Sequence, residues 1–414
     1  MGESAIDTVY TKRDLQRYRE KTQRCLDALA RMLAEDSFAL GPERMGLELE
    51  LNLVDENLDP AMANQTVLEH IDDPAFQTEL GQHNIEINVA PRPLADDEAL
   101  ELERELRAGL NTANDAARSA GVGLVMIGIL PTLRPDHFDE RWMSPKSRYA
   151  LLNRQILATR SEDLELDIEG VPLAGEKPER LLRAADSILP ESGCTSAQLH
   201  LQVGPNEFAA HWNAAQALAG AQVAVAANSP FLLGHALWHE TRIPLFEQAT
   251  DTRSPELCNQ GVRPRVWFGE RWITSIFDLF EENVRYFPAL LPVCEDEDPV
   301  EVLDRGDTPA LGELRLHNGT VYRWNRPVYD VLKGRPHLRV ENRVLPAGPT
   351  VADMFANAAF YAGLTRALAE AERPIWTQMS FSAAEENFHA CARHGIDATV
   401  FWPGLGYVPV TELV

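Results

Sequence analysis

Polar side chains, several of them acidic, recur at every second position in several short segments of the sequence. Glu48, Glu50, Glu86 and Glu341 occupy such positions, and most of their neighbours are aliphatic. A period of two is typical of a β-strand that buries one face, so the carboxylates are expected on the polar faces of their strands. Carboxylates that converge raise one another's pKa unless a cation neutralises them.

His200, Arg315 and Arg343 occupy the equivalent polar positions. The alternating segments are GLELELNLV (46–54), HNIEINVA (83–90), TSAQLHLQV (195–203), GELRLH (312–317) and LRVENRVL (338–345). Oxygen ligands with one imidazole suit Mg²⁺ or Mn²⁺ better than zinc. Arginine holds a carboxylate or phosphate through two parallel hydrogen bonds. The pattern therefore predicts a metal–phosphate site on an open sheet.

A polar strand face that simply meets solvent is the alternative for any one of these segments. Solvated strand faces favour threonine, serine, lysine and mixed charges, but the polar positions of these five segments carry no lysine. Their enrichment in glutamate, histidine and arginine favours a shared site.

The chain alternates between expected strands and expected helices. Strands are predicted at 44–54, 82–90, 123–130, 195–203, 311–318 and 337–345, and helices at 12–35, 96–119, 146–160, 206–228, 231–248, 273–287, 350–372 and 383–394. We predict an α+β fold in which a mostly antiparallel open sheet carries helices on its apolar face. An N-terminal helical segment at 1–40 would precede a single α+β domain at 41–414.

Composition and charge argue against nucleic acids and membrane surfaces as partners. The chain has 414 residues, 45% of them hydrophobic, and a net charge of −25. This charge repels nucleic acids and anionic membranes, although arginines or a metal ion can still admit a small anionic substrate. No apolar stretch is long enough to span a bilayer. Five cysteines without close spacing, and an N-terminus without an apolar signal region, predict a cytoplasmic protein.

Several common catalytic motifs are absent from the sequence. It contains no GxxxxGK[ST] phosphate loop, no GxGxxG after a strand, no GxSxG elbow and no HExxH. His235 and His239 lie four residues apart on an expected helix, where they could bind a metal. Ordinary histidines are the favoured interpretation, because no third ligand lies nearby in the sequence.

A set of segments, in this order, resembles the glutamate–cysteine ligase family in its carboxylate–amine ligase branch. They are GLELELNLVD (46–55), ELGQHNIEINVAPRPL (79–94), TSAQLHLQV (195–203), RLHNGTVYRWNRP (315–327) and ENRVLPAGPTVADMFANAAFYAGL (341–364). The resemblance covers most of residues 40–405. It implies the glutamine-synthetase-like fold, in which an antiparallel sheet forms an open funnel with helices behind it.

The resemblance also implies roles for individual residues. The metal ligands would be Glu48, Glu50, Glu79, Glu86, His200 and Glu341. Arg343, with Arg315 and Arg323 as helpers, would hold the transferring phosphoryl group or the substrate carboxylate. The nucleotide would contact His200, Arg343 and Arg323. The sequence departs from the family at Gln202, where relatives often carry a second histidine or another small polar residue. It ends at Val414, where relatives are expected to continue into further helix.

The implied activity is an ATP-dependent carboxylate–amine ligase that forms an amide through an acyl phosphate, with Mg²⁺ or Mn²⁺. L-glutamate and L-cysteine are the default substrates, and another acid or amine is the first alternative. A guanidino-kinase-like phosphotransferase would need a reactive cysteine near the sheet, such as Cys194. A non-catalytic nucleotide-binding homologue is the third interpretation. The expected partners are small molecules, and the sequence leaves oligomerisation open.

Overall fold

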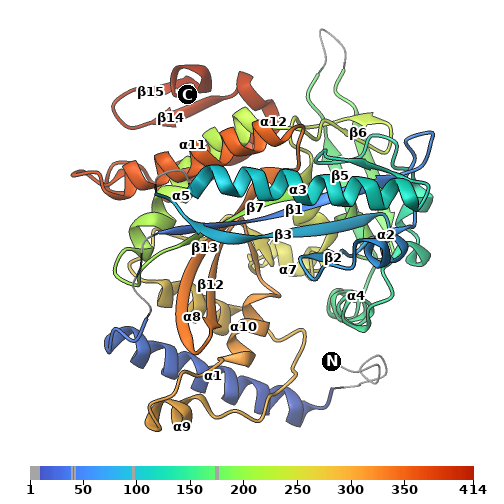
Figure 1. Ribbon diagram of the computed structural model, residues 1–414. Coiled ribbons are helices and arrows are strands. Elements are labelled where there is room, and N and C mark those ends of the chain that lie inside the picture. Colours follow the sequence, from blue (N-terminus) through green and yellow to red (C-terminus); the bar gives the residue numbers. More distant parts are fainter. Residues whose placement is uncertain (1–9, 39–40, 42, 96–97, 173–176) are drawn as a thin grey trace.

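A single antiparallel sheet organises the computed structural model, which describes residues 10–38, 41, 43–95, 98–172 and 177–414 (Figure 1). Its strands follow the order β12-β13-β7-β1-β3-β2, and β4 pairs with the end of β1. The strands are β1 (Arg44–Val54), β2 (Phe76–Thr78), β3 (Asn84–Pro93), β4 (Gly123–Val125), β7 (Ser196–Gln202), β12 (Asn325–Leu332) and β13 (Arg335–Pro346). Every pairing in this sheet is antiparallel, as predicted.

The remaining elements surround this sheet. Four two-stranded pairs are β5 (Leu164–Glu169) with β6 (Arg180–Ala185), β8 (Phe231–Leu232) with β9 (His235–Ala236), β10 (Val266–Trp267) with β11 (Tyr322–Arg323), and β14 (Thr399–Trp402) with β15 (Gly406–Pro409). The α-helices are α1 (Lys12–Ala34), α2 (Asn64–Ile71), α3 (Glu98–Ser119), α4 (Ser147–Arg160), α5 (Phe208–Ala226), α6 (Arg242–Ala249), α7 (Pro255–Asn259), α8 (Ile276–Tyr286), α9 (Pro299–Asp304), α10 (Gly312–Asn318), α11 (Val351–Ala369) and α12 (Phe381–His394).

Helices cover the apolar face of the sheet. The leucines at alternate positions of β1, from Leu47 to Leu53, are almost fully buried. In Figure 1, α3, α5, α11 and α12 lie together on one side of the sheet, and α5 packs directly on β13. The expected α+β fold with helices behind an antiparallel sheet is confirmed. Its opposite, polar face remains available for a site.

The β12–β13 hairpin extends beyond the sheet toward α1, α8 and α10 (Figure 1). Thr11 and Asp14 form a reciprocal capping box that begins α1. Leu29 and Met32 of this helix are fully buried in the main hydrophobic core, and the Tyr18 hydroxyl donates to the carbonyl of Glu313 on α10 at 2.9 Å. Helix α1 therefore shares its core with the sheet, and a boundary near residue 40 stays a prediction.

One predicted strand, at 311–318, is wrong because this segment is α10. Its apparent alternation is short, and its buried residues, Glu313, Leu314, His317 and Asn318, instead form one face of a helix. Spacings of three and four residues place side chains on one helical face, so a six-residue pattern supports either element.

Two further predictions of secondary structure need correction. The expected helix at 231–248 begins as the β8–β9 hairpin, because Leu233 and Gly234 both have positive φ and form a tight turn. His235 lies in that hairpin and His239 precedes α6, so they do not share a helix. The expected strand at 123–130 pairs with β1 only as far as Val125. Residues 96–97, at the start of another expected helix, lie outside the described residues.

Candidate active site

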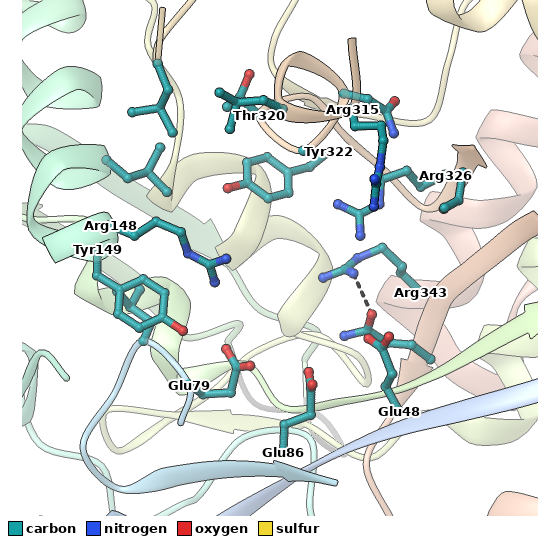
Figure 2. A pocket seen from close by; sticks show the side chains of 18 of the residues that line it. Glu48, Glu79, Glu86, Arg148, Tyr149, Arg315, Thr320, Tyr322, Arg326 and Arg343 are labelled. Atoms are coloured by element: carbon teal, nitrogen blue, oxygen red, sulfur yellow. Dashed lines mark hydrogen bonds between the residues drawn. The ribbon is translucent and has the colours of Figure 1, made fainter. Parts of the chain in front are cut away.

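A cavity of about 710 Å³ lies against the polar face of the sheet. Glutamates from β1 and β3 form its floor in Figure 2, and Arg326 and Arg343 of the β12–β13 hairpin lie on one side. Arg148 and Tyr149, in the first turn of α4, lie on the opposite side (Figure 2). The cavity therefore places carboxylates between two cationic walls.

Glu48, His200 and Glu341 form a first group of metal-binding atoms, here called the His200 cluster. Strand register creates this group, because His200 of β7 lies directly opposite both Gly46 of β1 and Glu341 of β13. One ligand atom from each of the three side chains lies within 4.8 Å of the others. His200 Nε2 is 2.9 Å from Glu48 Oε1, yet neither ring nitrogen has an aligned hydrogen-bond partner among the described residues. A nitrogen lone pair is thus available to a metal ion.

Two arginines keep Glu341 ionised although it is completely buried. Burial alone would raise its pKa, but Arg326 and Arg343 together hold that pKa far below its ordinary value. Arg326 donates from Nε at 2.7 Å and from Nη2 at 2.9 Å, and Arg343 also contacts the carboxylate. Glu341 is therefore an anionic ligand at neutral pH.

Glu50, Glu79 and Glu86 form a second group, here called the Glu79 cluster, whose ligand atoms also lie within 4.8 Å. Glu50 of β1 lies directly opposite Glu86 of β3, and Glu79 follows the edge strand β2. Burial, with Glu48 and Glu50 nearby, raises the pKa of Glu86 to about 7. Burial and the same kind of repulsion raise the pKa of Glu79 well above its ordinary value. A bound cation would offset the repulsion among these three carboxylates.

The two clusters suit hard divalent cations. Five carboxylates and one imidazole match the oxygen-rich ligand sets of Mg²⁺ and Mn²⁺, and no cysteine takes part. A bound cation would give the ring nitrogens of His200 an aligned partner. It would also stabilise the ionised forms of Glu79 and Glu86, whose pKa values are raised. Each cluster can accommodate such an ion.

The segment that carries Glu79 is tied to the start of α4. The Ser144 hydroxyl donates to the backbone carbonyl of Glu79. The Oγ atom of Ser144 also accepts a hydrogen bond from Asn64 Nδ2 at 2.8 Å. The Tyr149 hydroxyl donates to the carbonyl of Thr78 at 3.1 Å. These bonds fix the position of the Glu79 cluster relative to the wall that carries Tyr149.

The sequence of residues 44–413 matches the profile of glutamate–cysteine ligase family 2 (GCS2). The chain belongs to this family. Among solved structures, the chain is similar to the glutamate–cysteine ligase of Francisella tularensis in complex with AMP, at 13% identity and a TM-score of 0.53. The match covers 91% of this chain and 76% of that one. Family membership indicates a ligase of the glutamate–cysteine ligase type, and the structural likeness shows the fold.

A second structural match is weaker. The bifunctional glutathione synthetase of Pasteurella multocida aligns at 10% identity with a TM-score of 0.46, over 91% of this chain and 43% of that one. Comparison of the sequence with curated proteins finds no significant match. Among the described residues, none of the helices combines the length and apolar character needed to cross a membrane.

Of the three arginines that the resemblance assigned to the site, two line the cavity and one does not. Arg343 lies in the cavity on β13, and Arg315 reaches it from α10, with Nη2 2.9 Å from Asp330 Oδ1. Arg323 does not line the cavity. Its fully buried guanidinium pairs with Glu282 at 2.6 Å and also contacts Asn283. The predicted role of Arg323 in holding phosphate or nucleotide gains no support from this position, because Glu282 already compensates its charge.

The residues that line the cavity and that the sequence interpretation missed include Arg148, Glu191 and Arg326. Arg326 shares a strand face with Asp330, so the alternation of NRPVYD (325–330) carried a signal, which Pro327 obscured. Arg148 begins a helix, and Glu191 lies in the short 3₁₀ helix η4 (Leu189–Gly193). Because neither residue lies in a strand, no alternation in the sequence predicts the direction of its side chain.

Proposed function

We propose that the protein joins the γ-carboxylate of L-glutamate to the amino group of L-cysteine, with cleavage of ATP to ADP and phosphate. The observation that carries the proposal is one cavity lined by Arg343, by the Glu79 cluster and by Glu48 of the adjoining His200 cluster. GCS2 membership supports the reaction class. Five cysteines that are all free thiols support a cytoplasmic enzyme.

The reaction needs an activated acid, because a carboxylate is a poor electrophile. The γ-carboxylate attacks the terminal phosphoryl group of ATP, which forms an acyl phosphate and releases ADP. The amine then attacks the acyl carbon. The bond between this carbon and the phosphate oxygen breaks, so that phosphate leaves as the amide forms. Mg²⁺ or Mn²⁺ held by the two clusters would neutralise charge on the phosphates.

Protein side chains supply orientation in this scheme. Arg343 faces the clusters and would hold the transferring phosphoryl group, since its rigid fork matches phosphate oxygens. Arg148, which forms no ion pair with the described residues, is placed to receive a substrate carboxylate from the opposite wall. No covalent intermediate with the protein is required, so the absence of a nucleophilic triad is consistent with the scheme.

A guanidino-kinase-like activity is less well supported. It would call for a thiolate close to the sheet, and Cys194 is the nearest candidate before β7. Burial raises the pKa of Cys194 well above its ordinary value, which keeps this cysteine as an unreactive thiol.

A panel of acids and amines, each incubated with ATP and Mg²⁺, tests the proposal. Phosphate release should require both glutamate and cysteine, and the product mass should equal the sum of the two amino acids less one water. Glu165→Gln, which changes an exposed carboxylate on β5, is the control for charge removal. Phosphate release without a condensed product, or a phosphorylated acceptor, would contradict the proposal.

A further inference from the structure

Glu191 lines the cavity from a rigidly held part of the chain. Its backbone carbonyl accepts from the N–H of Cys194 at 2.9 Å, just before β7 begins. At the other end of η4, the N–H of Ile188 donates to Asn153 Oδ1 of α4 at 2.9 Å. Both the sheet and α4 therefore determine where Glu191 lies.

The carboxylate of Glu191 is half-buried and has no partner. Among the described residues, no donor hydrogen-bonds to its side chain and no cation lies within salt-bridge distance. A half-buried carboxylate without a hydrogen-bond partner loses part of its hydration, and that loss is unfavourable unless a ligand group replaces the lost water. A positively charged ligand group would provide this carboxylate with a partner.

A metal ion does not account for this carboxylate. Glu191 belongs to neither group of ligand atoms that lie within 4.8 Å of one another. Its surroundings include the apolar side chains of Ile188 and Leu152, which also line the cavity. An organic cation tolerates such surroundings better than a divalent ion, which keeps its water or demands more oxygen ligands.

We propose that Glu191 binds the ammonium group of an amino-acid substrate. The inference rests on the proposed ligase reaction and deepens it, because it requires one of the two substrates to be a zwitterion. A charge-assisted hydrogen bond from an ammonium group would provide the carboxylate with a partner. Glutamate and cysteine both carry such a group, so the ammonium can come from the acid or from the amine.

Two substrate analogues separate these sources. Glutarate is glutamate without its ammonium group, and hydroxylamine is an amine that is uncharged at neutral pH. The acid arm compares kcat/KM for glutamate and glutarate, with hydroxylamine as the acceptor. The amine arm compares cysteine and hydroxylamine, with glutamate as the acid. Each arm is measured in wild type and in Glu191→Gln.

The expected result is a preference for the ammonium-bearing substrate in one arm of the wild type, which falls at least tenfold in Glu191→Gln. Glu191→Asp should restore part of that preference, because it keeps the charge. Equal preferences in wild type and Glu191→Gln in both arms would overturn the inference. So would a variant that loses activity equally with all substrates and needs more Mg²⁺, because Glu191 would then serve the metal clusters.

Controls distinguish this failure from that of the proposed function. A wild type that forms neither hydroxamate nor amide with any acid would overturn the ligase proposal and the inference with it. Glu165→Gln should leave both preferences unchanged. Melting temperatures of all variants identify a loss of folding, and Glu191→Asp keeps the test informative if Glu191→Gln is unstable.

Discussion

Arg343 contacts two protein groups and still faces the cavity. Its Nη1 lies 2.5 Å from Gln198 Oε1 and also contacts Glu341, so it could serve only as a structural ion pair. The two roles differ in the expected effect of Arg343→Lys. A phosphoryl clamp would lose roughly 2.7–4 kcal/mol of transition-state stabilisation, which lowers kcat about a hundredfold or more. A structural pair would tolerate lysine with nearly normal kcat.

Arg326→Lys is the matched comparison for that measurement. Arg326 uses two nitrogens on Glu341, so its replacement should lower the free energy of unfolding by about 1–3 kcal/mol. We expect the rate to fall less than in Arg343→Lys. A near-normal kcat and an unchanged melting temperature in Arg343→Lys would contradict the clamp.

Glu50 tests the Glu79 cluster as a cation site. Burial raises its pKa, so the charged form is unfavourable in the protein without metal. Glu50→Gln should therefore abolish most turnover, while the unfolding free energy in chelator stays equal or increases. Enzyme assays over a range of Mg²⁺ and denaturant unfolding with chelator provide the two measurements. Full activity of this variant, or of the wild type in chelator, would refute a metal-dependent mechanism.

At the scale of elements, strand period was a reliable guide wherever the alternating segment formed a strand of the main sheet. β1 and β13 are 11 and 12 residues long, and their alternation placed Glu48 and Glu341 on the polar face. The short pattern around Arg315 turned out to be helical, although it still reaches the cavity. Glu191 could not be placed, because a single turn of 3₁₀ helix has no repeating pattern and its position depends on contacts distant in the sequence.

Ser144 links Glu79 to Asn64 of α2, a contact that no pattern in the sequence predicts. Because its hydroxyl bonds both the Glu79 carbonyl and Asn64, Ser144→Ala should cost about 1–3 kcal/mol of unfolding free energy. It should also raise the Mg²⁺ concentration needed for half-maximal activity, since Glu79 loses its anchor. Ser229→Ala removes a buried serine outside the cavity and is the control. If both variants show the same Mg²⁺ requirement as wild type, the link does not position Glu79.

At the scale of the whole molecule, a strongly negative protein concentrates arginines where its proposed substrates are anionic. The net charge is −25, yet Arg148, Arg315, Arg326 and Arg343 all line one cavity. The sequence allowed arginines to gather beside these carboxylates but did not locate them, because the four residues come from a helix start, a short helix and two strands. Their convergence is a property of the folded chain.

Acid stability also depends on the whole fold, through buried histidines. Burial lowers the pKa of His83 to about 3, and both of its ring nitrogens lack partners among the described residues. The unfolded chain binds a proton at this residue below about pH 6.5, whereas the folded protein does not until about pH 3. Stability from a neutral His83 is therefore complete above pH 6.5 and is lost as the pH falls.

His83→Phe isolates this effect, because it keeps an aromatic ring beside Trp142 and removes the titration. The linkage gives about 1.36 kcal/mol per pH unit, so wild type should lose about 2 kcal/mol more than the variant between pH 7 and pH 5. Denaturant unfolding of both proteins at the two pH values measures the difference. The carboxylates of the cavity titrate in both proteins, so their contributions cancel in the comparison. Equal losses in the two proteins would show that His83 is protonated in the folded state.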